Sequence, residues 1–315
     1  MDEIYYYLGI RNLRLTTPNQ QGRDVRILQS LLNMFPDNIV PGKLVVDGIF
    51  GPITRTAVRN FQRYFGLVVD GIVGQESFLR LGHRIGKYAV GEAVFSSRYL
   101  SSGARGGDVS VLQNRLAAYK KGYLNRRADG RFGFFTDAAV QRLQSDFPEL
   151  AVDGVANPDT YEQIFIRAPL GGRTLRQNDR GLDVYWLQYY LYQLNYYKGE
   201  LNGYFQSSTT DAVKDFQTAA GITIDGIVGP ETYLTLGTNI AFPQQEYYYR
   251  VQPGDSVFII SRLFNKEIED IINLNNLTPP DYIIKTGQLL LIPVPLSFHL
   301  ALKGETLADV ASKYS

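Results

Sequence analysis

The feature that most constrains this chain is an internal threefold repetition. The pattern Gly-x-Asp-Val-x-x-Leu-Gln begins at Gly22, at Gly106 and at Gly181. Each copy is followed by a second pattern, Ala-Val-x-x-Phe/Leu-Gln, and then by an Asp-Gly dipeptide. Three patterns that recur three times in the same order indicate tandem copies of one small supersecondary unit rather than a single large domain.

Within one copy, the spacing of apolar residues predicts helices. Val25, Leu28 and Leu32 recur at three- and four-residue steps, which places them on one face of a helix. A second amphipathic helix is expected over residues 54–65, and a third, shorter one begins near Gly74. Three short helices enclose a core near the lower size limit for independent folding, so we expect neighbouring copies to stabilise one another.

Two sets of aspartates mark the boundaries of these helices. In the first pattern the carboxylate is placed to accept free backbone N–H groups as an N-cap. This set comprises Asp24, Asp108 and Asp183. In the closing Asp-Gly dipeptide the aspartate is expected in a tight turn. This second set comprises Asp70, Asp153 and Asp225. We predict structural roles for both sets.

The three copies resemble the helical peptidoglycan-binding domain found on many bacterial and phage cell-wall hydrolases and spore-cortex enzymes. The resemblance rests on the two helical patterns and on the Asp-Gly-x-Val-Gly close. It implies units at 1–90, 91–170 and 171–242 that bind peptidoglycan. The second copy departs from the pattern at Ala156-Asn157-Pro158, and the third has Asn202-Gly203 where the others have Asp-Gly. Whether all three units bind ligand is left open.

A different pattern follows residue 242. Residues 247–251 alternate like a short strand, and Pro253-Gly254 then interrupts it ahead of a helix over 257–264, capped by Ser256 or Asp255. A second helix is expected over 267–274 and a second strand over 289–293. Strand, two helices and strand predict a βααβ unit.

This segment resembles a LysM module, whose ligands are glycans that contain N-acetylglucosamine, such as peptidoglycan or chitin. The resemblance rests on Tyr-x-Val-x-x-Gly-Asp-Ser from Tyr249, together with Ile-x-x-Leu-Asn and Gly-Gln-x-Leu-x-Ile-Pro. It implies a shallow sugar-binding groove between two loops. The residues that it implicates are Gly254, Asp255, Ser256, Val257 and Phe258 on one side, and Asn275, Leu277, Tyr282 and Ile283 on the other.

The last residues repeat the opening of that module. We therefore expect one LysM unit at 247–296 and the start of a second, incomplete one at 297–315, interrupted by truncation. The predicted architecture is a multidomain, mainly α protein with three three-helix units and one βααβ unit.

Composition limits the chemistry that this chain can perform. With 32 Lys+Arg against 31 Asp+Glu, the net charge of +1 disfavours a nucleic-acid partner. Cysteine is absent, which excludes thiolate catalysis and Cys-ligated metals. The two histidines, His83 and His299, lack the spacing of zinc ligands. We expect no catalytic site, no metal and no other cofactor.

Aromatic residues in the third copy admit two interpretations. Along the helix that begins at Asp183, a second stripe comprises Trp186, Tyr190 and Tyr197. We favour packing between modules as the role of this stripe. The alternative is a platform on which the C–H faces of pyranose rings stack.

Three hypotheses for function follow. The first is non-catalytic, multivalent binding of peptidoglycan, and the second is targeting of a larger wall or spore-cortex hydrolase. The third is assembly of a spore coat or envelope through protein partners. Residues 1–14 lack the features of a signal peptide, and no stretch is long enough to cross a bilayer. We expect a cell-wall or spore-envelope location without membrane insertion, by an export route that the sequence leaves open.

Overall fold

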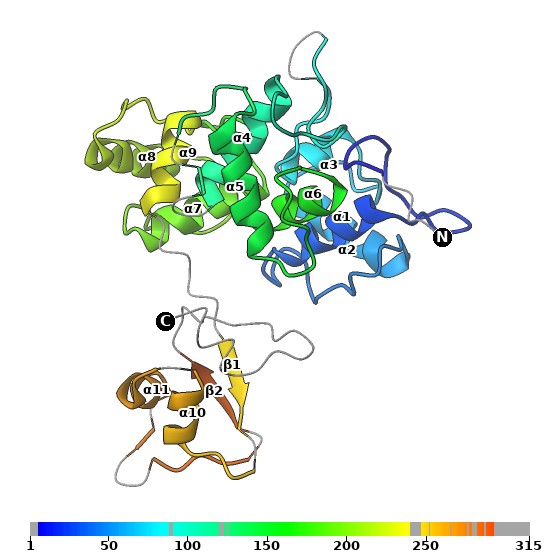
Figure 1. Cartoon of the computed structure of the whole chain (residues 1–315). Coiled ribbons are helices and arrows are strands. Elements are labelled where there is room, and N and C mark those ends of the chain that lie inside the picture. Colours follow the sequence, from blue (N-terminus) through cyan, green and yellow to red (C-terminus); the bar gives the residue numbers. More distant parts are fainter. Residues whose placement is uncertain are drawn as a thin grey trace. The chain divides into compact units, whose positions relative to one another are not determined.

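The structure, a computed structural model, describes residues 6–87, 91–119, 123–124, 126–239, 247–251, 253–264, 266–275, 277–278, 282–286 and 288–292. These residues fall into two compact units, one within Met1–Ile240 and the other within Ala241–Ser315 (Figure 1). The expected second LysM at 297–315, with His299, lies outside the described residues. The predicted boundaries between the three copies stay predictions.

The described part of the first unit contains nine helices, three from each copy of the repeat (Figure 1). The first copy gives α1 (Arg23–Asn33), α2 (Pro52–Tyr64) and α3 (Gln75–Arg80), the second gives α4 (Gly107–Tyr119), α5 (Phe134–Ser145) and α6 (Pro158–Arg167), and the third gives α7 (Leu182–Gln193), α8 (Ser207–Ala220) and α9 (Pro230–Asn239). The predicted mainly α fold of three-helix units is confirmed.

Each copy consists of two half-units of helix, turn and helix, and the middle helix belongs to both. A buried glutamine on the first helix of each half holds the turn that follows it, as Gln29 does for Asp47-Gly48. Its Nε2 donates to the carboxylate of Asp47 at 2.8 Å, and its Oε1 accepts the Gly48 N–H at 2.9 Å. The same pair of contacts is made by Gln62, Gln113, Gln144, Gln188 and Gln217, with Asn202 replacing Asp in the fifth turn.

Glycine is required at the second position of these turns. The six glycines there have φ between 70 and 76°, the left-handed region that a side chain disfavours. The preceding Asp or Asn accepts the backbone N–H two residues later, as Asp70 does from Ile72 at 2.8 Å. Asp153 and Asp225 make the same contact with Val155 and Ile227.

The aspartates of the first pattern are not the N-cap residues, although each carboxylate accepts the backbone N–H of the residue that follows it. Helices α1 and α7 have Gly22 and Gly181 at the N-cap, without a side-chain cap, so Asp24 and Asp183 lie inside the first turn. Asp108 likewise lies inside the first turn of α4. All three carboxylates are buried. Each accepts two hydrogen bonds from an arginine in the segment that precedes its helix, which compensates for the loss of water. The pairs are Arg11–Asp24, Arg98–Asp108 and Arg173–Asp183.

The three copies pack against one another within the first unit. Helix α4 contacts α9, α1 contacts α6, and one continuous apolar core spans the first two copies. Between the first and third copies, the Tyr64 hydroxyl donates to the Asn202 carbonyl at 3.0 Å, and the Phe65 and Tyr204 rings stack. The expectation that neighbouring copies stabilise one another therefore has a direct structural basis.

The second unit has the predicted βααβ order. It comprises β1 (Tyr247–Arg250), α10 (Val257–Leu263), α11 (Ile268–Leu274) and β2 (Leu289–Ile292). The strands pair antiparallel, with Tyr249 opposite Leu290. Val251, Ile260, Ile271, Leu290 and Ile292 form most of the small buried core. Among the described residues, no helix combines the length and apolar character needed to cross a membrane.

Candidate functional site

A groove of about 370 Å³ lies on the surface of the βααβ unit. Three segments border it: the loop that enters α10, one face of α11, and the loop that precedes β2. The lining residues are Asp255, Ser256, Val257, Phe258, Ile268, Ile272, Tyr282, Ile283 and Ile284. Six of the residues that the sequence implicated in glycan binding therefore border a single groove.

The polar end of the groove is set by the start of α10. Ser256 is the N-cap residue, and its hydroxyl oxygen accepts the Ile259 N–H at 3.2 Å. This resolves the choice between Ser256 and Asp255 as the capping residue. Asp255 instead accepts a hydrogen bond of 2.8 Å from the Tyr249 hydroxyl, which ties the loop to β1. The carboxylate is thus held at the edge of the groove by the sheet.

Apolar side chains form the walls and floor of the groove. Phe258 is 60% exposed and Ile283 is 70% exposed, although both are large and hydrophobic. Val257 also lines the groove and is buried, and Ile272 packs partly against the core. Exposed apolar walls that converge on a groove are suited to the flat C–H face of a sugar ring or to an acetamido methyl group.

Three implicated residues do not line this groove. The Asn275 carboxamide is bonded to β2, donating to the Leu291 carbonyl and accepting the Leu291 N–H, both at 2.7 Å. Leu277 packs against the core of the unit. Gly254 occupies the turn before α10 with a φ of 89°. Their contacts in the structure are therefore structural.

Sequence reasoning missed Ile268, Ile272 and Ile284 as lining residues. The sequence predicts that Ile268 and Ile272 lie on the second helix of the unit, but it assigns them no role in binding. Both side chains are partly buried against the core, and they also border the groove. A four-residue spacing alone does not distinguish these two surroundings.

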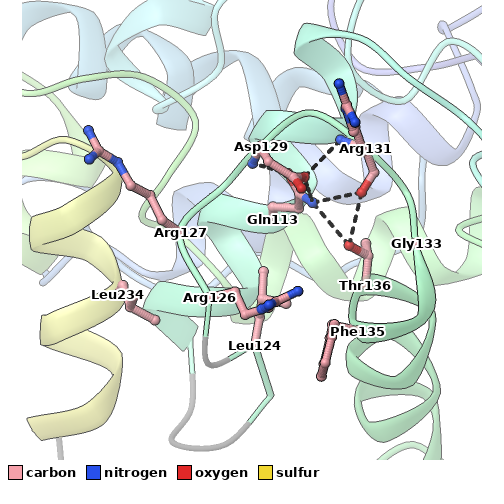
Figure 2. Close-up of a pocket in the computed structure, with 10 residues that line it drawn as sticks. All are labelled: Gln113, Leu124, Arg126, Arg127, Asp129, Arg131, Gly133, Phe135, Thr136 and Leu234. Atoms are coloured by element: carbon pink, nitrogen blue, oxygen red, sulfur yellow. Dashed lines mark hydrogen bonds between the residues drawn. The ribbon is translucent and has the colours of Figure 1, made fainter.

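A second cavity, of about 600 Å³, lies in the second copy of the repeat (Figure 2). It is bordered by the turn between α4 and α5, by the start of α5, and by Leu234 of α9. The other lining residues are Gln113, Leu124, Arg126, Arg127, Asp129, Arg131, Gly133, Phe135 and Thr136. Gln113 and Asp129 are bonded to each other at 2.8 Å as part of the turn.

Burial of its rings argues against the alternative aromatic platform, and α7 ends at Gln193, so Tyr197 lies beyond the helix that was expected to carry it. Tyr190 and Tyr197 are each only 3% exposed, and burial raises the pKa of the Tyr190 hydroxyl well above its ordinary value. Trp186 is partly buried and packs against the cores on both sides of it. Packing between modules fits Trp186 and Tyr190, whereas the Tyr197 hydroxyl bonds Gln188 and the Glu200 carbonyl of its own copy.

Within the described part of the chain, no cluster of three or more His, Cys, Asp or Glu side chains could hold a metal ion. His83 is buried, and its Nε2–H donates to the Leu8 carbonyl at 2.7 Å. Its ring meets Phe165 of the second copy edge-on. The surroundings of this histidine are those of a packed core residue.

Comparison with known protein families identifies domains in both compact units. The family model of the peptidoglycan binding domain matches residues 21–81, 105–164 and 180–236, which together make up more than half of the chain. The model of the LysM domain matches residues 249–293. These matches agree in number and order with the copies that the sequence patterns define.

Three curated proteins show similarity over part of their length. The chain is 30% identical over 135 residues to the N-acetylmuramoyl-L-alanine amidase CwlM of Mycobacterium tuberculosis, covering 43% of this chain and 32% of that protein. It is 46% identical over 66 residues to the zinc D-Ala-D-Ala carboxypeptidase of Streptomyces albus G, covering 21% and 26%. It is 31% identical over 166 residues to the amidase CwlL of Bacillus licheniformis, covering 44% and 45%. The chain spans less than half the length of each relative.

Proposed function

This chain belongs to the peptidoglycan binding domain family and carries a LysM domain after its three copies, and on that premise we propose that it anchors itself to cell-wall glycan without catalysing a reaction. Binding is multivalent: several weak sites act together on one repeating polymer. The polymer is peptidoglycan or another glycan that contains N-acetylglucosamine, and the location is the cell wall or a spore envelope.

The groove of the LysM domain is the observation that carries this proposal. It combines two exposed apolar side chains, Phe258 and Ile283, with the polar start of α10 at Asp255 and Ser256. An N-acetylglucosamine residue offers a matching set, namely an apolar ring face, an acetamido methyl and an amide. We propose that Phe258 and Ile283 hold the ring and that the floor at Val257 accepts the methyl.

The direct test is titration of the whole chain with an N-acetylglucosamine tetramer, in parallel with co-sedimentation on purified sacculi. We expect heat of binding from the tetramer and recovery of the chain in the pellet. Replacing Phe258→Ser removes one wall and should weaken tetramer binding by roughly tenfold, because about 1–2 kcal/mol of apolar contact is lost. Leu263→Ser is the matched control, since Leu263 is 61% exposed on the same helix but does not line the groove.

Two results would count against the proposal. The first is absence of heat with the tetramer together with recovery of the chain in the supernatant above sacculi. The second is binding to envelope extracts that requires their proteins and is lost on purified glycan. That second result would favour the assembly of a coat through protein partners.

A second candidate function is targeting of a hydrolytic domain to the wall. The names of the relatives favour it, because two are amidases and one is a carboxypeptidase. A fusion of an amidase domain to this chain tests targeting, with the turbidity of a sacculus suspension as the measurement. If the chain targets hydrolysis, the fusion should clear the suspension faster than the free amidase domain does, whereas equal rates of clearing would leave anchoring by the chain alone as the better account.

A further inference from the structure

Three arginines border the cavity of the second copy and have no counterpart in the other two copies. The turn that begins at Asp129 aligns with those at Asp47 and Asn202, because the same glutamine contacts hold all three. In this alignment Arg126 is replaced by Leu44 in the first copy and by Gly199 in the third. Arg127 is replaced by Val45 and Glu200, and Arg131 by Ile49 and Tyr204, in the same order.

These arginines give the cavity an excess of positive charge, because a single carboxylate, Asp129, lies among them and interacts electrostatically with Arg131. Arg126, Arg127 and Arg131 are exposed, and none forms an ion pair within the described ranges. The one carboxylate on the cavity wall, Asp129, accepts hydrogen bonds from Gln113 and from the Arg131 backbone N–H. Figure 2 shows the side chains of Arg127 and Arg131 on either side of Asp129, with Arg126 directed toward Phe135.

Aromatic and apolar groups complete the cavity. The Arg126 guanidinium lies 4.1 Å from the centre of the Phe135 ring, which fixes its orientation. Phe134 and Phe135 are 78% and 51% exposed at the start of α5, where the other copies have Pro52-Ile53 and Ser207-Ser208. Leu124 and Leu234 lie on the remaining wall. An arginine beside an exposed ring suits a ligand with both a carboxylate and an apolar surface.

We propose that the second copy is a dedicated site for the carboxylates of peptidoglycan peptide stems, an assignment that rests on the wall-binding function proposed above. At neutral pH the peptidoglycan strand carries its negative charge on those carboxylates. Three separated guanidiniums can engage more than one of them, while Phe134 and Phe135 contact the adjoining sugar or peptide. The first and third copies lack these arginines, so they do not distinguish peptide stems with free carboxylates from stems without them.

The test uses the whole chain and two matched soluble probes, measured by calorimetry at low salt. One probe is N-acetylmuramyl-L-alanyl-D-glutamate, and the other is the same compound with both carboxyls converted to amides. The variant Arg126→Gln/Arg127→Gln/Arg131→Gln removes the three charges from exposed positions, so the fold is expected to survive. The control Arg14→Gln/Arg59→Gln/Arg176→Gln makes the same change of net charge at exposed arginines of the first and third copies. Thermal unfolding of all proteins checks their stability.

We expect the acidic probe to bind the wild type and the control alike, and the triple variant about tenfold or more weakly, as for the loss of charge-assisted hydrogen bonds. Equal affinity of the wild type for the diamide, or unchanged affinity of the triple variant for the acidic probe, would overturn the proposal. A glycerol-phosphate oligomer that displaces the acidic probe and binds far more tightly through the same arginines would also overturn it, in favour of a phosphodiester polymer. Sacculi sedimented in parallel separate the two claims, because a chain that binds the acidic probe through these arginines yet leaves sacculi unbound contradicts only the proposed function.

Discussion

Six buried glutamines act at the scale of single residues to close the turns of the repeats. Gln144 is fully buried, and its carboxamide bonds Asp153, the Val155 carbonyl, the Gly154 N–H and Thr160. These contacts satisfy backbone groups that would otherwise be buried without a partner. The glutamine thus connects one helix to the turn and to the start of the next helix.

Replacing Gln144→Met keeps the approximate shape of the side chain but leaves those backbone groups unpaired. We expect the free energy of unfolding to fall by about 2–4 kcal/mol, because the cost of several unmet buried hydrogen bonds is added together. Urea denaturation followed by circular dichroism measures the change. Gln193→Met, at an exposed position near the end of α7, is the control and should alter stability by less than about 0.5 kcal/mol. Equal effects of the two substitutions would contradict this role.

Because of His83, the stability of the first unit should depend on pH. Burial, assisted by the nearby charge of Arg115 and opposed by the Leu8 carbonyl, lowers the pKa of His83 from 6.5 to about 3. The folded protein therefore keeps the ring neutral, while the unfolded chain takes up a proton below about pH 6.5. The stability that depends on the neutral ring is complete above pH 6.5 and is lost as the pH falls toward 3.

Unfolding measured at roughly pH 7.5 and roughly pH 5 tests this linkage, because few carboxylates titrate in that interval. We expect the wild type to lose about 2 kcal/mol between the two conditions. In His83→Gln most of this difference should disappear, although the variant starts from a lower stability. His299→Gln keeps the buried ring and serves as the control. A wild-type stability that stays constant across the interval would show that His83 is accessible to protons when folded.

Residue roles were only partly predictable from sequence. The Asp-Gly turns could be expected because glycine is needed at positive φ and aspartate readily bonds the backbone nearby. The pairing of Asp24 with Arg11 could not, since a first-turn aspartate is equally compatible with capping and nothing local identifies a distant partner. The repeated Arg-x-Leu ahead of each copy, at Arg11, Arg98 and Arg173, was the overlooked signal.

At the scale of elements, helix positions followed from periodicity, whereas contacts between helices did not. The stripe of Val25, Leu28 and Leu32 is buried as predicted. The contact of α4 with α9 joins the second and third copies, and it depends on the absence of a side chain at Gly237. A Cβ atom there would lie 1.7 Å from the Ala117 carbonyl oxygen. A lone glycine inside a helix pattern does not reveal which neighbour requires it.

Gly237→Ala should therefore separate α4 from α9 despite the better helix propensity of alanine. We expect unfolding free energy to decrease by about 1–3 kcal/mol, because the obstructing atom is backbone and the helix as a whole must shift. Gly229→Ala is the control, since nothing lies within 4 Å of a Cβ at that position. Thermal denaturation compares the two. A stabilised Gly237→Ala variant would mean that the two helices can move apart freely.

At the scale of the whole molecule, several shallow sites are joined by one chain. The LysM groove and the cavity of the second copy lie on separate compact units. The number and order of the modules were predictable because repetition is visible in sequence. The arginines of the cavity lie within six residues of one another in the sequence, but the cavity itself was not anticipated, because its wall also includes Leu234, about a hundred residues further along the chain.

Linked weak sites predict that insoluble wall and soluble fragments respond differently to loss of the groove. In Phe258→Ser/Ile283→Ser we expect the affinity for an N-acetylglucosamine tetramer to disappear, and the apparent affinity for sacculi to fall by roughly 10²–10⁴. The remaining first-unit sites should still retain some protein at high sacculus concentration, because they bind independently of the groove. Leu263→Ser should match the wild type in both assays. If the groove variant loses the tetramer yet sediments with sacculi as tightly as the wild type, the LysM domain adds nothing to anchoring, and the helical repeats alone hold the chain on the wall.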